Sequence, residues 1–115
     1  MALSEFEIKR VEREADKFLL KRRPPAYVRK ELDFGYEIHN QNVIISEIRP
    51  DWKKPDEIHH RPFARATYVK SKKHWKVYWM RQDLKWHSYE PVSTVKSIEE
   101  FFAVVDDDAH HCFFG

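Results

Sequence analysis

Cysteine and glycine are scarce in this sequence. Its single cysteine, Cys112, excludes an intramolecular disulfide framework. Its two glycines, Gly35 and Gly115, are too few for the glycine-rich loops that hold phosphates in P-loop and dinucleotide-binding proteins. The sequence is therefore typical neither of a disulfide-rich secreted domain nor of a nucleotide-binding enzyme.

Long hydrophobic runs are absent as well. The longest cover only a few residues, such as 101–105, whereas a membrane-spanning helix needs roughly 20. The first residues also lack the basic and apolar segments of a signal peptide. We therefore expect a cytoplasmic protein with no membrane partner.

Net charge is small, but aromatic residues are plentiful. Lysine and arginine exceed aspartate and glutamate by only two, so a charged partner would have to recognise a local patch. Eight Phe, five Tyr and four Trp predict a largely aromatic core. A chain of 115 residues fits one domain, and we expect a single domain over residues 1–115.

The first segment has the pattern of an amphipathic helix. Ser4 and Glu7 are spaced as a capping box, which predicts that the helix begins there. Pro24 and Pro25 end it, since the residue before a proline avoids the helical conformation. Apolar residues recur at helical spacing between these limits: Ile8, Val11, Ala15, Phe18 and Leu19. The following residues, 27–32, are expected to form a connector.

From Phe34 onward apolar and polar residues alternate, and this period of two predicts β-strands. Residues 34–39 and 43–49, with turn residues 40–42 between them, are expected to form a β-hairpin. The proline-rich segment 50–62 is expected to be a surface loop, because proline is excluded from central strands. Three more strands are predicted at 64–70, 74–81 and 84–89. Together these segments predict an antiparallel meander.

The C-terminal segment predicts a short helix. Ser97 and Glu100 repeat the capping-box spacing. Residues 106–108 are all aspartate, and because their charge opposes the helix dipole we expect the helix to end at or before them. The apolar tail, 109–115, is expected to dock on the domain. The predicted fold class is thus α+β, with an N-terminal amphipathic helix, a five-stranded antiparallel meander sheet and a short C-terminal helix.

Several blocks of the sequence resemble a known family. They are EIRPDW at 47–52, ARATYVK at 64–70, WKVYW at 75–79, DLKWH at 83–87 and CFFG at 112–115. Together they resemble the family named domain of unknown function 3024, from the first helix to the final glycine. The resemblance implies a stand-alone bacterial domain, and it supplies no activity, ligand or catalytic residue.

A basic segment, residues 61–87, stands out beside this family pattern. It holds eight lysines and arginines against the lone acid Asp83, with aromatic residues between them. In the predicted meander, one sheet face carries core-like side chains: Ala64, Ala66, Tyr68, Trp75, Val77, Trp79, Leu84 and Trp86. The other face carries Arg65, Thr67, Lys76, Tyr78, Lys85, His87 and Tyr89.

Basic side chains beside exposed tyrosines suit nucleic acid, because cations neutralise phosphates and rings stack on unpaired bases. We predict that phosphates are contacted by Arg65, Lys76, Lys85 and His87, and that bases stack on Tyr78 and Tyr89. Two alternatives stay open. The face is an ordinary solvated one, or the basic segment pairs with the acidic residues Glu99, Glu100 and 106–108.

The histidines and the cysteine are weak candidates for a metal site. These residues are His59, His60, His110, His111 and Cys112. Adjacent histidines rarely both reach one ion, and no Cys-x-x-Cys or His-x-x-x-His spacing occurs. We therefore expect no metal and no other cofactor, and we expect Cys112 to be a buried, inert thiol.

An enzyme is a competing hypothesis, although no catalytic residue is assigned. Asp51 follows a proline and Asp83 precedes Lys85 by two residues, which loosely matches the PD…D-x-K arrangement of metal-dependent nucleases. This hypothesis places carboxylates in a cleft with histidines, namely Glu47 and Asp51 with His87 or His59.

Self-association is a third hypothesis. The strand 43–48 is apolar on both faces, which invites burial by a second copy of the chain. We favour a non-enzymatic binding or interaction module, with nucleic acid as the first candidate partner and a homodimer as the next.

Overall fold

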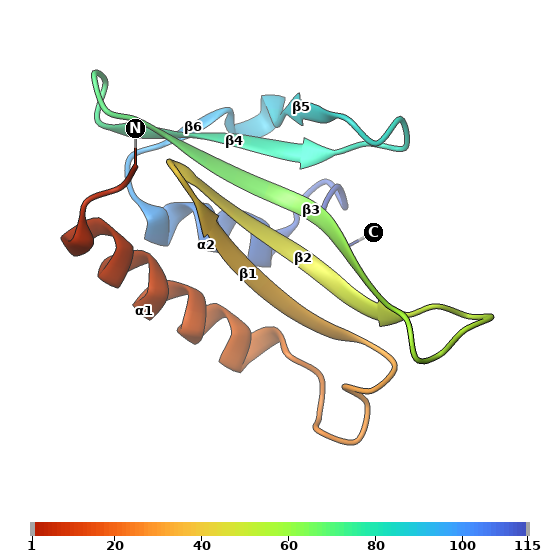
Figure 1. The fold of residues 1–115 in the computed structure, drawn as a ribbon. Coiled ribbons are helices and arrows are strands. Elements are labelled where there is room, and N and C mark those ends of the chain that lie inside the picture. Colours follow the sequence, from red (N-terminus) through yellow and green to blue (C-terminus); the bar gives the residue numbers. More distant parts are fainter. Residues whose placement is uncertain (1, 115) are drawn as a thin grey trace.

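The computed structural model describes residues 2–114. It contains two α-helices, six strands and one 3-10 turn, in an order that Figure 1 follows from red to blue. The bounds are α1 Glu5–Arg22, β1 Asp33–His39, β2 Asn42–Pro50, β3 Ile58–Val69, β4 His74–Met80, β5 Trp86–Ser88, η1 Glu90–Val92, β6 Thr94–Val95 and α2 Ile98–Asp107.

The strands form one antiparallel sheet in meander order, β1-β2-β3-β4-β5. This confirms the predicted α+β class and topology. The short strand β6 was not predicted; it also pairs with β4. Strand β3 occupies one edge of β4. Strands β5 and β6 therefore both pair with the other edge of β4, one after the other, with η1 between them.

Helix α1 begins and ends where the sequence predicts. The Ser4 Oγ accepts the Glu7 amide at 3.2 Å, and the Glu7 carboxylate accepts the Ser4 amide at 3.1 Å, which completes the capping box. The helix ends at Arg22, directly before the residue that precedes Pro24. Its buried stripe consists of Val11, Ala15 and Phe18.

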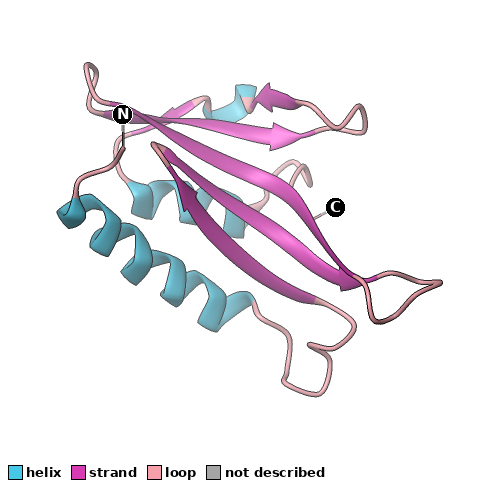
Figure 2. Ribbon diagram, in the orientation of Figure 1, coloured by secondary structure: helices cyan, strands magenta, loops and turns pink. Residues whose placement is uncertain are grey.

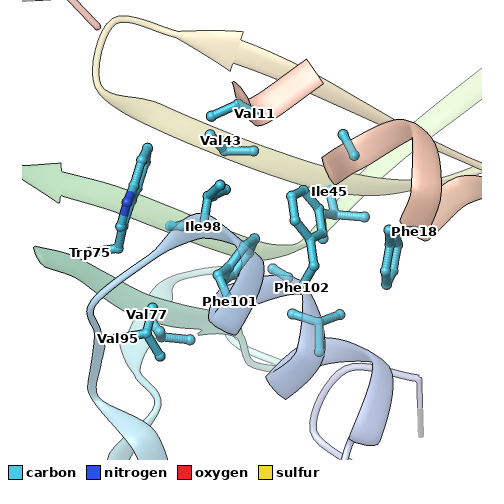
Figure 3. Close-up of a cluster of buried hydrophobic side chains, with 14 of the residues drawn as sticks. Val11, Phe18, Val43, Ile45, Trp75, Val77, Val95, Ile98, Phe101 and Phe102 are labelled. Carbon is cyan, nitrogen blue, oxygen red and sulfur yellow. The ribbon is translucent and has the colours of Figure 1, made fainter. Parts of the chain in front are cut away.

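Both helices pack on the same face of the sheet (Figure 2). Their apolar sides meet alternate residues of the central strands, such as Val43 and Ile45 of β2 and Val77 of β4 (Figure 3). The core is rich in rings, as predicted: Phe18, Trp75, Tyr89, Phe101, Phe102 and Phe113 are all buried. Within the described part of the chain, no helix covers the opposite face of the sheet.

Helix α2 ends at the aspartates, as predicted, but it includes two of the three. The cations of α1 compensate for the unfavourable charge: Lys21 Nζ and Arg22 Nε donate to the Asp106 carboxylate at 2.5 and 2.6 Å. Asp108 then ends the helix in the left-handed conformation, at φ 43°.

The C-terminal tail docks on the domain, as predicted for 109–115. The Asp108 carboxylate accepts the amides of Phe113 and Phe114 at 3.0 and 2.9 Å. Phe113 is buried, and the Phe114 ring contacts Phe18 and Phe34. Gly115 lies outside the described residues.

The prediction of a loop over 50–62 is wrong at both ends, because β2 reaches Pro50 and β3 begins at Ile58. The strand tolerates Pro62 since it lies beside a register shift, where the ladder of β2 and β3 skips Phe63. On its other side β3 pairs with β4 only from Ala64 onward. The missing amide hydrogen therefore breaks no regular ladder.

Candidate nucleic-acid interface

The surface of interest is the sheet face opposite the helices, here called the open face. Antiparallel partners share a face, so the register places Ile44, Arg65 and Tyr78 in one row across β2, β3 and β4. Thr67 and Lys76 form the neighbouring row. These residues alternate with the buried positions of the same strands. The open face thus presents basic and aromatic side chains to solvent.

The centre of the open face is a cluster of Arg65 with two aromatic rings. The guanidinium carbon of Arg65 lies 4.2 Å from the centre of the Tyr78 ring and 5.1 Å from that of Trp86. Trp86 belongs to this face because it pairs with Met80, two residues beyond Tyr78 on β4. All three cluster residues are half-buried. The cation–π contacts hold the two rings in defined positions on an uncovered surface.

The Nε of Arg65 is buried and has no hydrogen-bond partner among the described residues. Such an unpaired polar atom is unfavourable, and the contact with the rings offsets part of that cost. The Arg65 side chain is therefore held by stacking rather than by an acidic partner.

The cations of the basic segment lack acidic partners. Within residues 2–114, none of its eight lysines and arginines forms an ion pair: Arg61, Arg65, Lys70, Lys72, Lys73, Lys76, Arg81 and Lys85. The expected partners are used elsewhere, since Glu99 binds Arg10 and Asp106 binds the cations of α1. The interpretation that acidic residues neutralise this segment is therefore wrong.

The predicted faces of β5 are reversed. His87 pairs with Trp79, which places it on the helix-covered face, and its Nε2 lies 2.8 Å from the Asp83 carboxylate. Tyr89 is 1% exposed and packs on Phe113 with ring centres 4.9 Å apart, so it cannot stack on a base. Burial is the main reason that the pKa of Tyr89 is raised.

The turn before β5 explains the error. Leu84 adopts a left-handed conformation at φ 60°, and the Arg81 amide donates to the Lys85 carbonyl, so the chain turns back over residues 81–85. The strand begins at Trp86 instead of Leu84, and Trp86 pairs with Met80 while His87 pairs with Trp79. Relative to the predicted faces, this changes the register by one residue and exchanges the two faces. Leu84 is 81% exposed rather than part of the core. Trp86, assigned to the core by its sequence pattern, is the residue of the open face that this pattern missed.

Of the residues predicted to bind nucleic acid, the structure brings Arg65, Lys76 and Tyr78 together on the open face. Lys85 lies exposed in the adjacent turn, where its amide donates to the Asp83 carboxylate at 3.0 Å. His87 and Tyr89 belong to the other face.

The five metal candidates do not come together. Within the described residues, one group of three possible ligands lies close, Asp51, Glu57 and His59, with ligand atoms within 4.8 Å of one another. The Asp51 carboxylate already accepts the amides of Lys53 and Lys54. Its contact with His59 and these two amides hold the pKa of Asp51 below the ordinary value. Asp51 thus caps the loop between β2 and β3, and the Glu57 carboxylate lies 3.9 Å from Lys54 Nζ.

The carboxylates of the nuclease hypothesis are engaged separately. Asp51 contacts His59 at 2.9 Å, and Asp83 contacts His87 in the turn before β5. In both cases the hydrogen bond to the histidine is the main reason that the pKa of the aspartate is lowered. Glu47 forms an ion pair with Arg49. No described group of three ligands contains both Asp51 and Asp83.

Cys112 borders a cavity of about 240 Å³ that His87 and Arg81 also line. Burial raises the pKa of the Cys112 thiol, whereas a nucleophilic cysteine needs a lowered pKa. Cys112 is half-buried and not fully buried as predicted, and its Sγ donates to the His110 carbonyl at 3.7 Å.

The fold and the surface define a small α+β domain with helices on one face of its sheet and a basic, aromatic open face on the other. A family model covers residues 3–115, and the chain belongs to that family, the domain of unknown function DUF3024. No curated protein and no solved structure matches the chain. None of the helices in residues 2–114 has the length and apolar character to cross a membrane.

Proposed function

We propose that this domain is a non-enzymatic binding module that takes single-stranded nucleic acid on the open face, in the cytoplasm of a bacterium. The observation that carries the proposal is the coincidence, on one uncovered face, of cations without acidic partners and of two half-buried rings. Phosphates supply the missing negative charge, and bases supply flat partners for the rings.

The shape of the surface favours a single strand over a duplex. Rings on an open sheet stack on bases only where those bases are unpaired and splayed outward. Reading the major groove of a duplex requires an inserted helix or a two-stranded ribbon. Both α-helices lie on the covered face. The ligand class is therefore unstructured DNA or RNA, bound with little dependence on base identity.

The test is a fluorescence-polarisation titration with labelled single-stranded and duplex oligonucleotides at several salt concentrations. We expect tighter binding of the single strand, and an affinity that falls with salt, with a logarithmic slope of about −0.7 for each phosphate contact. Lys76→Glu should weaken binding several-fold and flatten that slope. Lys30→Glu is the matched control, because Lys30 is an exposed lysine of the connector before β1. Absence of binding at low salt would remove the proposal.

Self-association is the second candidate, supported by apolar side chains on the same face. Ile44, Ile48 and Met80 are half-buried there; Met80 pairs with Trp86, and Ile44 pairs with Arg65. Strand β2 is paired on both edges, so a second copy would cover its face and not extend the sheet from it. Light scattering across a concentration series distinguishes a monomer from a dimer.

A further inference from the structure

We propose that the bound strand runs lengthwise along β4, from the β3–β4 hairpin to the β4–β5 turn, and does not cross the strands of the sheet. This inference rests on the proposed function and adds the path and the length of the ligand. It follows from where the cations and the acids lie around the two rings.

Both ends of β4 are basic. The hairpin before β4 carries Lys70, Lys72 and Lys73, and the turn after it contributes Lys85; all four are exposed. None of them has an ion-pair partner in residues 2–114. The strand between these ends has seven residues, which span about 23 Å at 3.3 Å per residue. A phosphate backbone along β4 therefore meets positive charge at its start and at its end.

The middle of this path carries the groups that contact bases. Lys76 and Tyr78 are alternate residues of β4 on the open face, and Arg65 and Trp86 flank Tyr78 from β3 and β5. Two rings offer stacking surfaces for two successive bases, while the lysines at the two ends bind the phosphates on either side. The path thus accommodates roughly four nucleotides, the lower end of the site sizes of single-strand-binding folds.

A path across the strands meets unfavourable charge instead. The row of paired residues that contains Tyr78, Arg65 and Ile44 continues across the sheet to Glu37 on β1. Glu37 is exposed and forms no ion pair within the described residues. Its carboxylate repels a phosphate backbone, so the row across the sheet ends in unbalanced negative charge. The path along β4 also reaches a carboxylate, that of Asp83, but Arg81 and Lys85 lie in the same turn and outweigh it.

The experiment compares charge changes on the two paths by fluorescence polarisation with labelled oligothymidylates of two, four, six and ten nucleotides. Lys72→Glu tests the first end of β4, and Lys85→Glu tests the other. Glu37→Lys tests the path across the sheet. Lys30→Glu remains the control for net charge. All these positions are exposed, and circular dichroism verifies that each variant is folded.

If the strand runs along β4, affinity should rise with oligonucleotide length up to about four nucleotides. Longer oligonucleotides should then gain affinity only because they offer more overlapping binding positions. Charge reversal at either end should weaken binding at least threefold more than Lys30→Glu does, and Glu37→Lys should change affinity less than twofold. A gain with Glu37→Lys comparable to the loss with Lys85→Glu would overturn the path while leaving the binding function intact. No binding of any oligothymidylate by the unaltered domain would instead reject the proposed function itself.

Discussion

Arg65 and Tyr78 face each other across β3 and β4, and the guanidinium carbon lies 4.2 Å from the centre of the tyrosine ring. The contact joins the two chemical features of the open face, charge and aromatic surface, in one unit. Arginine carries a planar fork of donors that suits phosphate recognition and can also stack on an aromatic ring. Lysine at this position would retain the charge without the stacking.

Trp86 and His87 provide a test of the faces of β5, because they are neighbours in sequence that point to opposite sides of the sheet. Trp86→Ala should weaken single-strand binding by about 1–3 kcal/mol, the usual contribution of one stacked base. His87→Ala should leave the affinity unchanged. Fluorescence-polarisation titrations of both variants with a single-stranded oligonucleotide measure these affinities. An equal loss of affinity in both variants would contradict the assignment of the faces.

Tyr89 should behave as a core residue and not as a ligand contact. It is buried against Phe113, so Tyr89→Ala should lower the free energy of unfolding by roughly 3–5 kcal/mol. Tyr89→Phe keeps the ring and should cost less than about 1 kcal/mol. Tyr27 is 84% exposed, so Tyr27→Ala is the control in the same urea titration. Wild-type stability of Tyr89→Ala would argue against this packing.

Asp108 should anchor the C-terminal tail. Its carboxylate accepts the amides of Phe113 and Phe114, and its left-handed backbone suits aspartate or asparagine. Asp108→Ala leaves both amides without their acceptor and should cost about 1–3 kcal/mol per buried amide left unpaired. Asp108→Asn should cost less, because one acceptor oxygen remains. Hydrogen exchange at the two amides should be faster in the alanine variant, and unchanged exchange would refute the anchor.

The contact between α1 and α2 should make stability depend on pH. Hydrogen bonds from Lys21 and then Arg22 hold the pKa of Asp106 below its ordinary value. A carboxyl whose folded-state pKa is depressed stabilises the fold above its unfolded value, near 3.9, and this contribution is lost as pH falls through the lower folded value.

Asp106→Asn should therefore lower the free energy of unfolding at pH 7. The change should be only roughly 1 kcal/mol, because Lys21 is largely exposed. The variant should also lose less stability than the unaltered protein when the pH falls from 5 to 2. Urea titrations across this range measure the difference. Asp107→Asn, at the exposed neighbouring position, is the control. Parallel curves for Asp106→Asn and the unaltered protein would contradict the role of this contact.

Local patterns in the sequence were sufficient for most of the fold. The capping box at Ser4 and the prolines after Arg23 define α1 through contacts between residues a few positions apart. The alternation from Phe34 predicts the first hairpin, and the apolar face after Ser97 predicts α2. Arg65, Lys76 and Tyr78 were predicted on one face because a period of two within β3 and β4 needs no information from outside those strands.

Features that depend on the geometry of a turn or on distant partners were decided only by the tertiary structure. The sequence by itself determined the α+β class, the meander and the basic segment, since each depends on composition or local periodicity. Which of Trp86 and Tyr89 lies on the open face depends on how the turn after β4 sets the phase of β5. The aspartates of α2 are tolerated because α1 brings Lys21 and Arg22 against Asp106. The first outcome depends on the conformation of one short turn, which a period of two does not specify. The second arises from electrostatics between helices far apart in the sequence, which outweigh local preference where the two helices meet.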